Sequence, residues 1–185
     1  MPTNVPANDP VYPGWTYNNA GLNPWGHTDY AANDQIFYPA DTHPLQTTTL
    51  MSITDGLSNT IFVGEKAIDL SAIAAGSWFW DEPIILGGAG GTARCGLGMY
   101  RDSPNLQNLA ADPQSGFPYP DDPASNCGGG NWGAPWSAGV QFLFGDGSVR
   151  LVTYSQADNS SPPNFNTMLW KMIRPRDGQV VTFDN

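Results

Sequence analysis

The segment 139–154, GVQFLFGDGSVRLVTY, constrains the fold more than any other part of the chain. Before its central Asp146-Gly147 pair, large apolar residues occupy every second position, at Val140, Phe142 and Phe144. Successive side chains of a β-strand point to opposite faces, so we expect these three to enter a core together. Asp-Gly supplies the positive φ angles of a two-residue type I′ turn. The segment therefore predicts a tight β-hairpin within an antiparallel sheet.

Other stretches predict short elements joined by irregular loops. The 21 glycines and 17 prolines make up about a fifth of the chain, and this composition favours turns over long helices. We expect extended pieces at 28–33, 59–66, 76–86 and 179–183, a helical turn at 50–53 and a short helix at 165–173. The prediction is a single domain over 1–185, mostly β (α+β), with a long Gly/Pro-rich loop insertion at about 87–135.

The charge balance excludes one class of partner. Asp and Glu number 17 against 7 Lys and Arg, for a net charge of -10. Such a chain repels phosphate backbones, so we expect no nucleic-acid partner. No run of about 18 apolar residues is present, so this sequence contains no predicted membrane span.

The chain has two cysteines, Cys95 and Cys127, whose spacing matches neither a zinc motif nor a Cys-x-x-Cys redox motif. In an exported protein they are candidates for a disulfide, which would add roughly 3–4 kcal/mol of stability across a loop of this length. Two buried free thiols are the alternative.

Several aspartates are candidate metal ligands. Asp55 and Asp146, each followed by glycine, are first interpreted as turn residues, because Asp-Gly is favoured where a chain reverses. Calcium ligation by these two carboxylates is the alternative, and Asp121 and Asp122 are further candidates because Ca²⁺ prefers acidic loop oxygens. Calcium is the only cofactor that the sequence suggests.

No segment predicts a reaction centre. The two histidines, His27 and His43, lack any partner pattern, and no nucleophile elbow or zinc-protease motif occurs. Glycosidase chemistry needs two carboxylates roughly 5–10 Å apart, whereas adjacent residues on one strand, such as Asp81-Glu82, point to opposite faces. We therefore expect that the protein is not an enzyme.

Four segments together resemble one family. ITDGLSNTIFVGEK is similar to the TDGxSNT…GEK signature of bacterial prepilin-like proteins, catalogued as domain-of-unknown-function family 1559. HTDYAAN resembles the TDYAxN stretch of that family, and SAGVQFLFGDGSVRLV resembles its signature of a His separated by nine residues from Asp-Gly. LWKMIRPRDGQVV is similar to the closing motif. The matches run in order from about Thr28 to Val181, but Trp136 stands where the signature has its His.

The resemblance implies a pilin-like or pseudopilin-like head domain at the cell surface or outside the cell. Relatives normally begin with a pilin-type signal and a long hydrophobic helix. The present sequence contains no such segment, so it is a processed form, a shortened chain or a relative that never had the helix. No catalytic residues are established in the family that could be carried over.

We expect an extracellular structural subunit or accessory of a pilus-like filament, tube or secretion pseudopilus that assembles with copies of itself. Low charge and abundant aromatics suit a surface that becomes buried in an interface. The candidate contact residues are Trp15, Trp25, Trp132 and Trp136. The alternative is a monomeric carbohydrate- or solute-binding module, in which Trp132 and Trp136 stack on a sugar beside acidic residues.

Overall fold

The computed structural model describes residues 28–37, 48–68, 70, 92–104, 106, 118–119, 122–126, 130–157, 159 and 166–182. This part of the chain is mostly β, as expected, with a few short helices. Its strands are β1 (Tyr30–Asn33), β2 (Ile61–Glu65), β3 (Ala93–Arg94), β4 (Met99–Arg101), β5 (Pro118–Tyr119), β6 (Asp122–Asn126), β7 (Trp132–Ala134), β8 (Val140–Phe144) and β9 (Val149–Val152). Its helices are the 3₁₀ turns η1 (Leu50–Ser52) and η2 (Tyr154–Gln156) and the α-helix α2 (Met168–Ile173).

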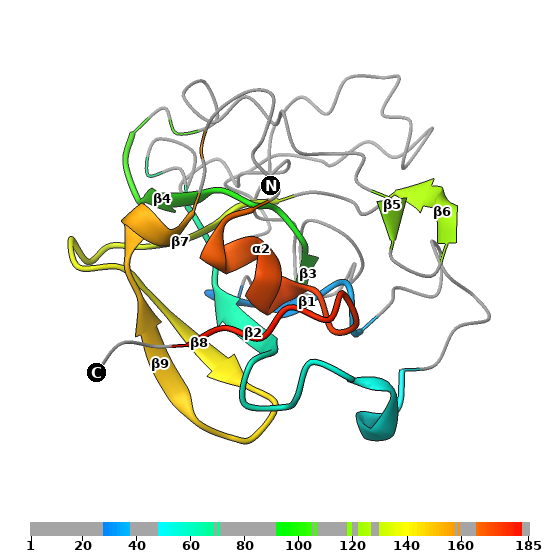
Figure 1. Ribbon diagram of the computed structural model, residues 1–185. Helices are drawn as coiled ribbons and strands as arrows, with labels where there is room; N and C mark the ends of the chain where they lie inside the picture. The colour runs from blue at the N-terminus through cyan, green and yellow to red at the C-terminus, as the bar shows by residue number, and fades with distance from the viewer. Residues whose placement is uncertain are drawn as a thin grey trace.

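A five-stranded sheet in the order β3-β1-β2-β8-β9 forms the centre of the fold (Figure 1). β2 runs antiparallel to β1 and β8, and β8 runs antiparallel to β9, whereas β3 runs parallel to β1. A second parallel pair joins β4 to β7. The sheet is therefore mixed, and the expectation of a purely antiparallel sheet is wrong at β3. A parallel pair needs a long connection, and the chain between β1 and β3, which includes β2, supplies it.

The predicted hairpin is present, but its turn differs from the predicted type. Val140, Phe142 and Phe144 are buried, and the residues between them are exposed, so the alternation is confirmed. The Phe144 amide donates to the Ser148 carbonyl, and the Gly147 amide donates to the Phe144 carbonyl. The loop thus has three residues, Gly145 to Gly147, and of its two glycines only Gly147 takes a positive φ (85°). This is the pattern of a three-residue hairpin with a bulge, which needs only one left-handed residue.

The core lies between one face of this sheet and α2, which passes in front of the strands in Figure 1. Leu169, Met172 and Ile173 of the helix are buried against the sheet, so the helical pattern predicted at 165–173 is confirmed within the described residues. Thr167 caps the helix by accepting a hydrogen bond from the Trp170 amide (3.2 Å).

Gly64 of β2 lets two aromatic rings pack directly on the strand backbone. A Cβ atom at this position would lie 2.4 Å from the Phe142 ring and 2.7 Å from Trp132. Phe142 and Trp132 meet edge to face there, with their ring centroids 5.4 Å apart. The glycine of the GEK motif is thus explained by packing.

Asn33 at the end of β1 connects three segments through its buried side chain. Its Nδ2 donates to the carbonyls of Ile61 in β2 (2.8 Å) and Ile173 at the end of α2 (2.7 Å). Its Oδ1 accepts from the Gln35 amide (3.0 Å). One fully buried amide therefore fixes the helix end to the two central strands.

Two further expectations differ from the structure. The segment 87–135, expected to be a long loop, contributes β3 to β7 within the described residues. Residues 179–182, expected to lie in a final edge strand, form no strand. The extended pieces at 28–33 and 59–66 and the turn at 50–53 are confirmed as β1, β2 and η1. The strand expected at 76–86 lies outside the described residues.

We predict that Asn33→Ala lowers the free energy of unfolding by about 2–4 kcal/mol, because it leaves two buried carbonyls without a donor. Urea denaturation of the purified protein measures this change. Gln141→Ala is the matched control: its side chain is exposed on β8, so a change within about 0.5 kcal/mol is expected. Equal stability of the two variants would contradict the role of Asn33.

Candidate functional site

Asp55, a predicted turn residue and candidate calcium ligand, holds the segment that follows α2. Its carboxylate accepts from the backbone amides of Asp177 and Gly178, each at 2.9 Å. The side chain is buried, with only 4% of the residue exposed. Both carboxylate oxygens of Asp55 therefore already accept hydrogen bonds from the protein itself. The geometry favours the turn interpretation of Asp55.

Asp146 has a similar local role in the hairpin turn. Its Oδ1 accepts from the amide (2.9 Å) and the hydroxyl (2.6 Å) of Ser148, and its Oδ2 pairs with Arg150 (3.2 Å). These bonds, led by that from the Ser148 hydroxyl, lower the pKa of Asp146 below its usual range. Asp146 thus orders the turn rather than presenting free oxygens.

Several other predicted residues are not brought to a described site. Asp121, Trp15, Trp25 and Cys127 lie outside the described residues, and Asp122 is described only through its backbone in β6. Among the described residues, no group of three or more His, Cys, Asp or Glu side chains could hold a metal ion. Cys95 is disulfide-bonded, and Cys127 is the only other cysteine in the sequence.

Trp132 and Trp136, predicted together as contact residues, have opposite environments. Trp132 in β7 is fully buried, and its Nε1 donates to the Gly96 carbonyl (2.9 Å). The prediction that it contacts a ligand or a second copy is therefore wrong, because it has no exposed surface. Trp136 is 56% exposed. It is the described tryptophan that can contact a partner.

The backbone around Trp136 is held although the ring is exposed. The Tyr154 hydroxyl lies within hydrogen-bond distance of the carbonyls of Ala134 (3.1 Å) and Trp136 (2.9 Å). Arg101 Nε donates to the Pro135 carbonyl (3.0 Å). The corner after β7 is thus fixed by β4 and by η2. An aromatic ring on such a backbone loses little freedom when it binds a partner.

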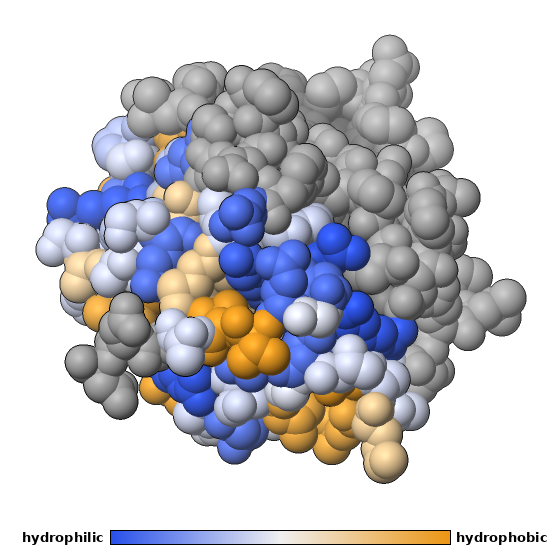
Figure 2. Space-filling view, viewed as in Figure 1, coloured by the Kyte–Doolittle hydropathy of each residue, from blue (hydrophilic) through white to orange (hydrophobic). Residues whose placement is uncertain are grey.

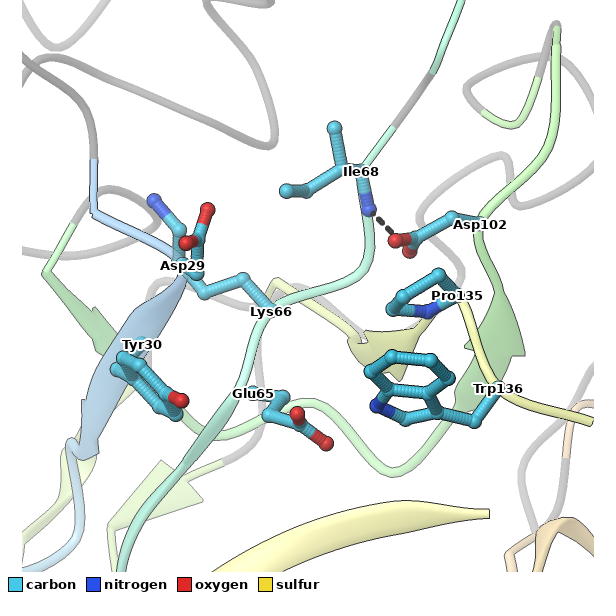
Figure 3. A pocket seen from close by; sticks show the side chains of 8 residues that line it. All are labelled: Asp29, Tyr30, Glu65, Lys66, Ile68, Asp102, Pro135 and Trp136. Carbon is cyan, nitrogen blue, oxygen red and sulfur yellow. Dashed lines mark hydrogen bonds between the residues drawn. The ribbon is translucent and has the colours of Figure 1, made fainter. Parts of the chain in front are cut away.

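A pocket of about 300 Å³ lies beside Trp136, where the end of β2 meets the loops that follow β4 and β7. The isolated bridge between Lys66 and Trp132 joins the two sheets at this point. Figure 3 shows Tyr30 and Trp136 on opposite sides, with Glu65 between them in this view. The lining residues are Asp29, Tyr30, Glu65, Lys66, Ile68, Asp102, Pro135 and Trp136.

Three carboxylates from separate segments line this pocket: Asp29 before β1, Glu65 at the end of β2 and Asp102 after β4. Asp102 accepts from the Ile68 amide (3.0 Å), and Glu65 accepts from the Gln141 amide (2.8 Å). Burial raises the pKa of Asp102, and the nearby negative charges of Glu65 and Asp29 raise it further. Ionisation of Asp102 therefore costs more free energy in the folded protein than in water.

The outer face of the β8–β9 hairpin is a second exposed surface, here called the hairpin face and formed by Leu143, Val149 and Leu151. Val149 pairs with Leu143 across the strands, so the two point to the same side, and Leu151 follows at the next position on that side. They are 37%, 62% and 48% exposed. β9 ends the order of the described sheet, so the hairpin face lies beside an edge strand.

Sequence reasoning missed Tyr30 and the three carboxylates of the pocket. Asp29 and Tyr30 lie in HTDYAAN, and Glu65 lies in the GEK motif. The sequence could have pointed to them only if these two motifs had been expected to lie side by side. Asp102 carries no such signal. Its place follows only from the pairing of β4 with β7.

Comparison with known proteins identifies a family but no function. The family described as proteins of unknown function, DUF1559, matches residues 3–159 of the chain. No curated protein and no solved structure matches. None of the helices in the described part of the chain has the length and apolar character that a membrane crossing requires.

We predict that Asp102→Asn raises the thermal stability at neutral pH. The pKa of Asp102 lies above its ordinary 3.8 in the folded protein, so wild-type stability falls as the pH rises through this range and the group ionises. The amide keeps an acceptor for the Ile68 amide, and an increase in Tm of about 1–3 °C at pH 7 is expected. Thermal unfolding at pH 3 and pH 7 measures the effect, which should vanish at the lower pH.

Asp146→Asn is the matched control with the opposite sign. The pKa of Asp146 is lowered, so its ionised form adds stability above the ordinary value, and this contribution is lost as the pH falls. The control should therefore not raise the Tm at pH 7. If Asp102→Asn lowers the Tm at pH 7, the interpretation of the pocket as a costly acidic cluster fails.

Proposed function

The chain belongs to the DUF1559 family, and on this premise we propose that it is an extracellular structural subunit or accessory of a pilus-like filament, tube or secretion pseudopilus. In this proposal the domain is a pilin-like head at the cell surface that assembles with copies of itself and catalyses no reaction. The resemblance of its motifs to prepilin-like proteins supports the proposal. The observation that carries it is the hairpin face.

The hairpin face combines exposed apolar side chains with an edge strand. Three aliphatic residues that are each more than a third exposed stand together on β8 and β9. Monomeric proteins commonly blunt such an edge with charges or proline, whereas Val149 to Val152 contain one charge and no proline. An edge of this kind supports addition of a strand from a neighbouring molecule.

The charge distribution favours a second copy as that neighbour. The chain has a net charge of -10, so most of its surface repels an identical molecule. The hairpin face is different, because its three residues are uncharged and the one charge of β9, Arg150, points to the opposite face, where it pairs with Asp146 at 3.2 Å and packs over the Phe144 ring. Two copies can therefore approach each other through these apolar side chains.

We predict that the double variant Val149→Lys, Leu151→Lys prevents assembly, because facing ammonium groups repel each other at the interface. Both side chains point outward, so the variant should fold normally, as checked by circular dichroism. Negative-stain electron microscopy and analytical ultracentrifugation of wild type and variant measure assembly. Met51→Lys is the control, since Met51 is 93% exposed on η1, away from the hairpin. Monomeric wild type at all concentrations would sink the proposal.

A monomeric carbohydrate- or solute-binding module is the second candidate function. The pocket favours it, because Trp136 and two aspartates line a concavity as this candidate predicts. Binding of a glycan panel to wild type and to Trp136→Ala, measured at a concentration where the protein is monomeric, tests it. Equal binding by the two proteins, or none by either, would count against a sugar site at Trp136.

A further inference from the structure

We propose that the pocket beside Trp136 binds an organic cation, with an ammonium or guanidinium group among Asp29, Glu65 and Asp102 and its apolar part between Tyr30 and Trp136. The inference shares its pocket with the second candidate function and names a ligand class for it. It does not depend on assembly through the hairpin face.

The balance of charge in the pocket favours a cation. Among the described residues, three carboxylates and one basic residue, Lys66, line the pocket, so negative charge is in excess there. Lys66 is buried (1% exposed), and its charge offsets part of that excess. Because the carboxylates come from three separate segments, their convergence results from the tertiary fold, unlike a run of acidic residues on a solvated loop.

The size of the pocket and the spacing of its ligands argue against a bare metal ion. No group of three acidic, histidine or cysteine side chains in the described ranges lies close enough to hold one. The volume of about 300 Å³ corresponds to roughly ten water molecules at about 30 Å³ each. A ligand the size of an amino-acid side chain fits this space and spreads one positive charge among separated carboxylates.

The aromatic residues supply the second part of the recognition. Tyr30 and Trp136 are each more than half exposed, and they stand on opposite sides of the pocket in Figure 3. Aromatic faces attract ammonium and guanidinium groups, and they also cover the alkyl chain that carries them. Because the corner at Trp136 is fixed by Tyr154 and Arg101, the wall exists before the ligand arrives.

A neutral sugar would stack on the same rings but would leave the excess of carboxylates over Lys66 without a counter-charge. Burial, Glu65 and Asp29 raise the pKa of Asp102, whereas the Ile68 amide and Arg94 lower it, and burial is the largest cause. A positive ligand would relieve the remaining repulsion on binding. A cation would reduce the electrostatic repulsion among the carboxylates of the pocket, whereas a neutral sugar would not.

Isothermal titration calorimetry with N-acetyl-lysine methylamide and N-acetyl-arginine methylamide as probes tests the proposal. The full chain is titrated at a concentration where ultracentrifugation shows a monomer. Both cations should bind, N-acetyl-norleucine methylamide should not, and added salt should weaken binding. Asp102→Asn and Trp136→Ala should each reduce the affinity by about tenfold, whereas Asp146→Asn, which removes one charge outside the pocket, should leave it unchanged.

Because Asp102→Asn is expected to stabilise the fold, its loss of binding would not reflect misfolding. Equal binding of the norleucine probe, or equal loss of affinity in Asp146→Asn, would overturn the proposal, as would no binding of either cation. If the wild type does not assemble in the hairpin experiment, the result of the calorimetry is unaffected. The proposed assembly and the proposed cation site are therefore tested independently.

A second measurement distinguishes two sources of the cation, a free amine or a Lys or Arg side chain of a neighbouring copy. Saturating N-acetyl-lysine methylamide should disperse wild-type assemblies if a neighbour's side chain occupies the pocket. It should leave them intact if the natural ligand is a small amine. Both results support a cation site and identify where the cation comes from.

Discussion

Buried beneath α2, the Asn33 amide donates to the carbonyls of Ile61 and Ile173, which lie 28 and 140 residues away along the chain. Short strands and a six-residue helix have little stability by themselves, so their mutual orientation depends on contacts of this kind. Asp55 has a similar role just after α2, where its buried carboxylate accepts hydrogen bonds from the amides of Asp177 and Gly178. A long, loop-rich chain is thereby held at its C-terminal segment by two polar side chains.

The position of the pocket follows from these constraints. With β1 fixed on β2, Tyr30 lies opposite Glu65, and the bridge from Lys66 to Trp132 brings β7 alongside. Gly64 is required for that approach, since its missing Cβ makes room for the Phe142 and Trp132 rings. The pocket therefore forms where the two sheets meet, at the ends of strands whose central residues pack in the core.

Local signals predicted much of the fold but little of the site. The alternation in β8 and the spacing in α2 are properties of single segments, so the sequence was sufficient for them. The turn type was wrong because Gly145 and Gly147 both flank Asp146, and only the backbone pairing decides that the loop has three residues. β3 and β4 are too short to show a period, and Arg94 in β3 is buried despite its charge. Nor does the sequence distinguish an inward Trp132 from an outward Trp136, because both lie in one Gly- and Pro-rich stretch.

The hairpin face and the pocket differ in their charge, and this difference bears on the kind of partner that each can bind. At the hairpin face, Leu143, Val149 and Leu151 carry no charge, and Arg150 points to the opposite face of β9, where it pairs with Asp146 and stacks on Phe144. Figure 2, which views the molecule from the side of α2, shows separate apolar patches among polar surroundings on that side. In the pocket, Asp102 keeps its carboxylate near two others although burial and repulsion oppose ionisation. A fold that only needed packing would gain stability from an amide at that position, which still accepts from Ile68. The raised pKa of Asp102 and the exposed Trp136 ring in the same pocket fit the positive ligand that we propose there.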